Sequence, residues 1–478
     1  MKDHWIKLLV AGIGIIAPTC MTHAGNSYDK KKNRSGQTYM LTRPIYHNSL
    51  AAWAGWDKFI ACKRCNHPTN IKITGMYQES HSWDKAAGYF LVDCKPTLTV
   101  AAGNTTSTRS HDVRAEWFNL AFTNDQKETI SLNPYQKRYG INLTINKCLQ
   151  DILPIPFFDQ LWTELNVPIV KTHTNLQATT SQPEILANLN HTLRYAQLTN
   201  TPDKKSGIPE IQLTFGNTYV HHNGFLLAYY SGLGIPTESS PQQKRLFPAT
   251  LGNNKHLVVL AGINARLPLF YCYDDTVRGQ LFFHAKNHHY IPNHQARTIP
   301  LKDKPWSQYL LVRRQGDSAT IPAANVLTRH VKVSPHSFAD INTGLLLSTP
   351  YITLHAAYGL WAHHDEQIEL RTQQCDTVPV TMHQYGIAGT GTNSASHSTI
   401  ATQADDDANF TTLKDTDLDL GKAGGRGIAS HRFNLMLSYT NEDHPDSFLA
   451  EIGGWYEVPH SNTHLKTWGI WGSIMKNF

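Results

Sequence analysis

Apolar and polar residues alternate along most of the chain after residue 70, in runs of about ten residues. The last run ends the sequence: Trp468, Ile470 and Ile474 share one face, whereas Thr467 and Ser473 share the other. Successive side chains of a strand point to opposite faces, so this pattern predicts a strand with one apolar face and one polar or small face.

The same alternation predicts many further strands. An Asn223-Gly224 pair between two of them predicts a tight hairpin turn, because Asn and Gly tolerate the positive φ that such a turn needs. The predicted strands cover residues 71–83, 88–100, 113–122, 138–148, 161–170, 211–219, 225–235, 351–364, 429–439 and 448–458.

Strands of this length with aromatic residues near their ends favour a transmembrane barrel over a soluble β-sandwich, whose strands are shorter. The chain ends on Phe478 within the last alternating run, where a barrel would close its final strand against its first. We therefore expect an all-β fold: a transmembrane antiparallel β-barrel of about 14 strands, within a range of 12 to 16.

Two segments carry a family resemblance. The final strand resembles the closing strand of Gram-negative outer-membrane β-barrels, whose assembly machinery recognises a terminal aromatic residue, and this implies an assembly signal at Phe478. Residues 207–267 are similar to a recurring segment of porin-like barrels related to aromatic-compound and fatty-acid channels. Pro209-Glu210 and Glu238 stand where that family has Gly-Asp and Gly.

Two stretches interrupt the alternation. Within residues 181–198, apolar residues follow the helical period and predict one short amphipathic helix, placed either at the barrel mouth or inside the lumen. Residues 386–426 are rich in Gly, Ser, Thr and Asp without periodicity, and predict one long, mobile surface loop.

Composition agrees with a barrel. Only 40% of the 478 residues are hydrophobic and the mean hydropathy is -0.38, which argues against a bundle of apolar membrane helices. The net charge is +6, but Lys and Arg concentrate only at residues 30–34, so nucleic-acid binding has no support. Residues 1–24 resemble a secretory signal peptide, residues 25–70 predict a periplasmic N-terminal segment, and the barrel is expected over residues 71–478.

Cysteine chemistry centres on Cys62 and Cys65, the one close pair. In an exported chain this spacing favours a local disulfide, with unpaired thiols, a metal site and a redox role as alternatives. The sequence offers no second CxxC pair, no converging metal ligands and no motif of a known hydrolase, so we expect no metal, no cofactor and no enzymatic activity.

Charged residues on the polar faces of the strands are the candidate functional residues. In a water-filled barrel they would face the lumen and set ion and solute selectivity. They are Arg138, Glu164, Glu210, Arg266, Arg432, Glu451 and Glu457.

The sequence thus predicts a porin-like channel of the cell outer membrane for passive passage of small solutes. Its expected partners are outer-membrane lipid, the barrel assembly machinery and the solutes. The alternative is a structural or adhesive surface barrel with a plugged lumen. Solute identity and oligomeric state do not follow from the pattern.

Overall fold

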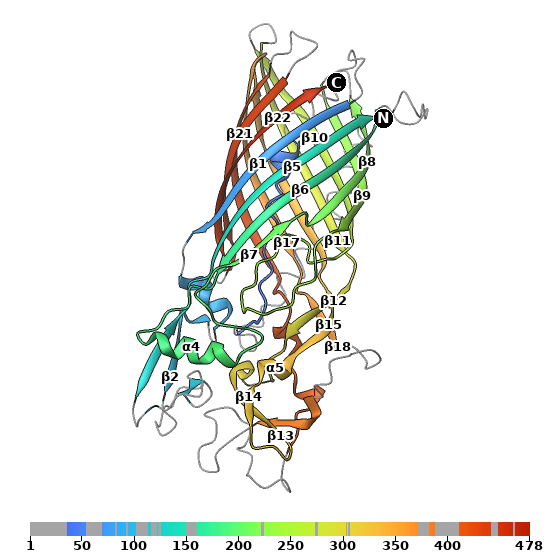
Figure 1. The fold of residues 1–478 in the computed structure, drawn as a ribbon. Coiled ribbons are helices and arrows are strands. Elements are labelled where there is room, and N and C mark those ends of the chain that lie inside the picture. Colours follow the sequence, from blue (N-terminus) through green and yellow to red (C-terminus); the bar gives the residue numbers. More distant parts are fainter. Residues whose placement is uncertain are drawn as a thin grey trace.

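The computed structural model describes residues 36–53, 69–81, 84–91, 94–101, 113–115, 122, 126–149, 160–220, 224–272, 276–302, 304, 306–370, 382–387, 411–440, 448–461 and 464–478. The long antiparallel strands form a tapering cylinder, and the shorter elements gather beyond one end of it (Figure 1). No helix within these described ranges is both long and apolar enough to cross a membrane.

The cylinder is a closed barrel. In the 13-stranded sheet, β7 (Asp203–Gly207) pairs only with β6, and the other 12 strands form a continuous ring. The ring closes where β1 pairs with both β22 and β5 and where β5 pairs with β6. The strands are β1 (Thr69–His81), β5 (Tyr135–Cys148), β6 (Leu161–Asn175), β8 (Glu210–Val220), β9 (Leu226–Pro236), β10 (Val258–Cys272), β11 (Val277–Tyr290), β16 (His336–Ser348), β17 (Ile352–His363), β20 (Ile428–Thr440), β21 (Phe448–Pro459) and β22 (Lys466–Asn477).

This closure confirms the predicted antiparallel barrel, with a strand number at the lower end of the expected range. The alternation places apolar side chains outside: Ile452 and Ile474 are 65% exposed, and Leu435 is 59% exposed. Polar side chains on the opposite face, such as Arg138 and Glu457, are buried. In a membrane this outer surface contacts lipid, while neighbouring strands of the closed ring pair their backbone groups along most of their length.

The two ends of the barrel differ in their connections. Thr69, the first residue of β1, and Phe478 lie side by side at one end, where the amide of Phe478 donates to the carbonyl oxygen of Thr69. The connections at this end are mostly short. Those at the other end run over residues 82–134, 176–209, 237–257, 291–335 and 364–427, with one short connection at residues 460–465. Outer-membrane barrels have short periplasmic turns and longer extracellular loops, so the end with the long connections is the extracellular one.

The long connections fold into an ordered extracellular cap with its own apolar core. Trp306, Tyr309 and Leu327 are almost fully buried there. Its helices are α4 (Pro183–Thr192), α5 (Ala324–Leu327), η1 (Asp84–Tyr89), η4 (Ser307–Tyr309), η5 (Met382–Gln384), η7 (Asp415–Asp417) and η8 (Leu420–Lys422). Its strands are β2 (Thr97–Ala101), β3 (Val113–Arg114), β4 (Lys127–Ser131), β12 (Asn293–Thr298), β13 (Leu311–Arg314), β14 (Thr320–Pro322), β15 (Thr328–Ser334), β18 (Gln367–Leu370) and β19 (Tyr385–Ile387).

Two predicted barrel strands belong to this cap instead. Residues 88–100 include the end of η1 and most of the short strand β2. Of the strand predicted at residues 113–122, the described residues form only the two-residue β3. Ala86, Tyr89 and Leu98 are buried in the cap core. Apolar residues that suit the lipid face of a strand suit a packed core equally well, so the pattern alone did not separate them.

The predicted helix is present in shortened form, because α4 covers Pro183–Thr192 within residues 181–198. Ile185 and Leu189 face the cap core, so the helix lies beyond the barrel and outside the lumen (Figure 1). The prediction of a mobile loop over residues 386–426 was wrong for residues 411–426. There η7 and η8 form, and Leu413 and Leu418 are buried in the cap core.

The described residues 36–53 of the N-terminal segment do not lie in the periplasm as predicted. Residues 36–53, including helix α2 (Ser49–Trp53), are mostly buried, and they run through the barrel interior. Thr38 bonds to the cap residues Thr298 and Lys422, whereas the carbonyl oxygen of Ala51 accepts from Lys72, near the periplasmic start of β1. We call residues 37–53 the lumen segment.

Candidate functional site: the occupied lumen

The lumen segment is attached to the barrel wall through Arg43. Its Nη2 lies 2.7 Å from Asp340 Oδ2 on β16, and its Nη1 lies 3.6 Å from Glu457 Oε2 on β21. Ser49 donates a second hydrogen bond of 2.6 Å to the same Asp340 oxygen. All four side chains are buried, so Asp340 and Arg43 neutralise each other inside the protein.

A second wall residue, Arg138 on β5, binds the backbone of the same segment. Arg138 Nη1 donates to the carbonyl oxygen of Arg43 at 2.5 Å, and its Nη2 donates to Thr42 Oγ1 at 2.6 Å. Arg138 is 1% exposed. The segment therefore receives a cation from one side of the barrel and a carboxylate from the other.

Two further polar contacts connect the interior. Lys72 lies 2.9 Å from Glu451 Oε2 and donates to the Ala51 carbonyl, which ties the periplasmic end of the segment to β1 and β21. His47 lies 3.7 Å from Glu210 Oε1 and stacks on His288 with ring centroids 4.2 Å apart. Apolar contacts add to these: Ile45 and Leu50 are buried in one cluster with inward-facing wall residues.

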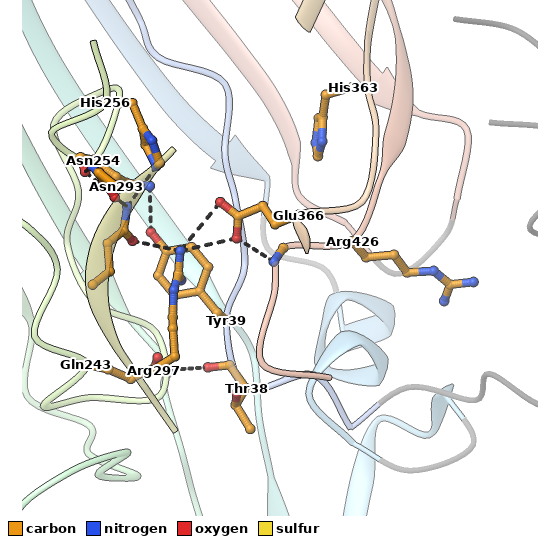
Figure 2. Close-up of polar contacts among 12 residues, drawn as sticks. Thr38, Tyr39, Gln243, Asn254, His256, Asn293, Arg297, His363, Glu366 and Arg426 are labelled. Carbon is orange, nitrogen blue, oxygen red and sulfur yellow. Dashed lines mark hydrogen bonds and ion pairs between the residues drawn. The ribbon is translucent and has the colours of Figure 1, made fainter. Parts of the chain in front are cut away.

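At the extracellular end, Tyr39 holds the segment against the cap (Figure 2). The Arg297 guanidinium lies over the Tyr39 ring, 3.2 Å from its centroid, and pairs with Glu366 at 3.2 Å. Glu366 also accepts from the amide of Gly425 at 2.7 Å, and Asn254 donates to the Tyr39 hydroxyl at 2.8 Å. These contacts join the segment, β12 and the connection that precedes β20.

Burial governs ionisation at this junction. It raises the pKa of Tyr39 to about 12, so the phenol stays neutral. Burial also lowers the pKa of His256 to about 4, although its bond to the Ile291 carbonyl opposes this. His256 is therefore a neutral hydrogen-bonding group between Ile291 and Gln295 at neutral pH.

The seven charged residues expected to face the lumen all lie on the inner faces of their strands, but they do not form one ring. Arg432 and Glu457 bond to each other across β20 and β21, with Nε 2.9 Å from Oε2. Arg138, Glu210 and Glu451 contact the lumen segment or the side chains that hold it. Arg266 and Glu164 line two small cavities of about 20 and 30 Å³. Their role in selectivity stays a prediction.

The sequence pattern did not indicate the residues that attach the lumen segment to the wall and the cap. Arg43 and Ser49 lie in the segment predicted to be periplasmic, and Asp340 and Arg297 lie in strands that the pattern did not predict. The available signal was the apolar content of residues 39–53, which is high for a solvated periplasmic segment. Nothing local indicated that Arg43 would meet Asp340, a residue almost 300 positions later.

Other predicted sites remain open. The predicted disulfide of Cys62 and Cys65 and the predicted signal peptide lie outside the described residues. Phe478 continues the outward row of β22 and is 53% exposed, while its role as an assembly signal stays a prediction. In the described part of the chain, no three His, Cys, Asp or Glu side chains converge as metal ligands would.

Comparison with known proteins gave structural likenesses only. No family model matches the chain, and no curated protein matches it. Similar solved structures include an outer-membrane channel from Pseudomonas putida F1 (10% identity, TM-score 0.40, 86% of this chain and 96% of that chain covered). The transport unit of the autotransporter AIDA-I from Escherichia coli has 8% identity and a TM-score of 0.35, and the match covers 92% of this chain and 99% of that chain. The CymD monoaromatic hydrocarbon channel has 9% sequence identity and a TM-score of 0.30, and the match covers 92% of this chain and 95% of that chain.

At these scores the likenesses are too weak to transfer a function, so the class of protein rests on the barrel itself. The ring is closed, its outer surface is apolar, its interior is polar and its long loops lie at one end. This combination is the architecture of Gram-negative outer-membrane proteins. The chain is therefore an outer-membrane β-barrel, as the sequence predicts.

Proposed function

We propose that the protein is a gated outer-membrane channel for small polar solutes, closed by the lumen segment. The passage would open when the segment shifts away from the wall, and no covalent chemistry is involved. This keeps the expected passive passage of small solutes and adds the segment as the gate.

The observation that carries the proposal is the polar character of the inner wall of the barrel. Asn142, Asn146 and Asn166 line the inner face of β5 and β6, and each has a buried amide oxygen without a protein partner among the described residues. Buried polar groups of this kind are satisfied by water. A barrel that served only as a scaffold would gain stability from an apolar interior in their place.

The alternative, a structural or adhesive surface barrel, is favoured by one observation. The cap has a large apolar core of its own and covers the extracellular end of the lumen. A permanently closed barrel that displays a folded cap would need no opening. The two functions differ in one measurable property, the conductance of the purified protein.

The test compares the wild-type protein with Thr42→Ala/Arg43→Ala/Ser49→Ala in planar lipid bilayers. This variant removes three side chains that bond to Arg138 and Asp340. We expect a mostly closed wild type and long-lived openings of the variant. Asn434→Ala is the matched control, because Asn434 is a buried residue of the inner wall whose amide makes no hydrogen bond to the described part of the segment. Equal conductance of wild type and triple variant contradicts the gate, and no conductance in any variant favours the structural alternative.

A further inference from the structure

Arg43 is bound to the wall in the way a free ligand would be. Its guanidinium contacts Asp340 at 2.7 Å, while its own backbone carbonyl accepts from Arg138 at 2.5 Å. The wall thus presents a carboxylate and a guanidinium at a spacing that one arginine residue fills. Both wall residues are 2% exposed or less.

These wall residues depend on the segment for their partners. Among the described residues, Asp340 accepts hydrogen bonds from Arg43 and Ser49 of the segment and from Asn342 of the wall. Among the described residues, the hydrogen bonds of Arg138 go to Thr42 and Arg43 only. If the segment moved away, a buried anion and a buried cation would both lose their compensation, which is costly unless another solute replaces it.

We propose that Asp340 and Arg138 form a binding site for a solute that carries a guanidinium group and a carboxylate or carbonyl oxygen, as arginine and arginine-containing peptides do. Arg43 occupies this site in the closed state. The proposal deepens the proposed function, since it names the class of solute that a gated lumen would select.

The surroundings favour a guanidinium over an ammonium group. Asp340 and Glu457 contact two different nitrogens of the Arg43 guanidinium, an arrangement that suits a planar fork rather than a point charge. The Trp361 ring lies 5.8 Å from Arg43 Cζ, within range of a cation–π interaction. Among the described residues Arg432 pairs directly with Glu457, whereas the direct ion pair of Asp340 is with Arg43.

The segment is covalently tethered, so Arg43 competes with free solute at an effective concentration of the order of millimolar. Binding is therefore measured on the full chain in detergent micelles with the variant Thr42→Ala/Arg43→Ala/Ser49→Ala, in which the segment is expected to leave Arg138 and Asp340. The method is calorimetric titration with three probes: L-arginine, citrulline and agmatine. Citrulline replaces the guanidinium by a neutral group of the same shape, and agmatine lacks the carboxylate. Arg43→Gln is the second variant, and it retains most of the side-chain volume if the alanine variant does not fold.

We expect L-arginine to bind the variant, and citrulline and agmatine to bind about tenfold to a hundredfold more weakly, because each lacks one charge-assisted contact. Adding Asp340→Asn should remove the preference for arginine over citrulline, and adding Arg138→Gln should remove the preference for arginine over agmatine. Equal affinity for arginine and citrulline, or no arginine binding to either Arg43 variant, overturns the site. Selective binding without conductance in any variant supports the site and overturns the channel.

Discussion

The outward position of Leu435 gives a quantitative test of how the barrel sits in a membrane. Leu435 lies near the middle of β20, and its side chain is 59% exposed on the outer face. Its partners across the two neighbouring strands are Ala356 and Gly454, which offer no polar group. Leu435→Arg would therefore place a guanidinium in the hydrocarbon region with lipid around it.

The expected cost follows from depth. An Arg on the lipid face of a barrel destabilises it by about 2–4 kcal/mol at the bilayer midplane and by about 0–1 kcal/mol near the interface. Tyr439 lies on the same face of the same strand, four residues closer to the periplasmic end. The two residues are therefore separated by about 14 Å along the strand, and by about 10 Å in membrane depth at the usual strand tilt. Leu435→Arg should therefore cost roughly 2–3 kcal/mol more than Tyr439→Arg.

The assay is reversible urea unfolding of both variants in lipid vesicles, followed by tryptophan fluorescence and by the mobility difference between folded and unfolded barrels. The comparison between two Arg variants cancels the effect of introducing the charge itself. If Tyr439→Arg costs as much as Leu435→Arg, the middle of β20 is not at the midplane. If neither substitution costs more than a few tenths of a kcal/mol, this face does not contact lipid.

Three further predictions follow from particular contacts. Arg432→Met should destabilise the barrel by about 3–5 kcal/mol, because the buried charge of Glu457 would lose its main partner. The double variant Arg432→Met/Glu457→Gln should recover part of that loss in the same unfolding assay. If the losses of the two single substitutions simply add, the two residues are not a coupled pair. Lowering the pH from 7 towards 4 should destabilise the cap, because the pKa of His256 is about 4 in the folded protein and 6.5 in the unfolded protein. The unfolded cap therefore takes up the proton first, and up to about 3 kcal/mol of the stability of the cap is lost. Hydrogen exchange of the cap should follow this pH dependence, and the dependence should be weaker in His256→Gln. Phe478→Ala should strongly reduce the amount of folded protein in the outer membrane of cells, while the yield of refolding in detergent should change little. The reason is that a side chain that stays 53% exposed contributes less to stability than the roughly 3–5 kcal/mol of a core Phe. Normal assembly of this variant in cells would show that Phe478 is not an assembly signal.

The barrel wall could be predicted because its physics is local. A strand that separates lipid from a polar interior must alternate with period two, and a register shift of one residue would turn every side chain to the wrong side. The rows of Leu435, Ile452 and Ile474 therefore face outward as their spacing predicts. Charged residues of the opposite rows, such as Arg138 and Glu457, were placed on the inner face for the same reason.

The cap was poorly predicted because its apolar residues obey no single period. Leu413 and Leu418 stand in a polar, aperiodic stretch, and they are buried only because residues from distant connections surround them. The strand number was also beyond local reasoning, since it depends on which alternating runs pair around the ring and which pack into the cap.

The sequence by itself thus determined an outer-membrane barrel, the face of each long strand and the set of charges that point inward. Only the tertiary structure decided what those charges meet. Arg43 and Asp340 are almost 300 residues apart in the sequence. Their contact at 2.7 Å exists because the lumen segment lies inside a ring whose strands all follow it in the chain. Local sequence patterns indicate whether a strand face contacts lipid or a polar interior. Which segment fills the lumen depends instead on long-range packing and on the need of each buried charge for a partner.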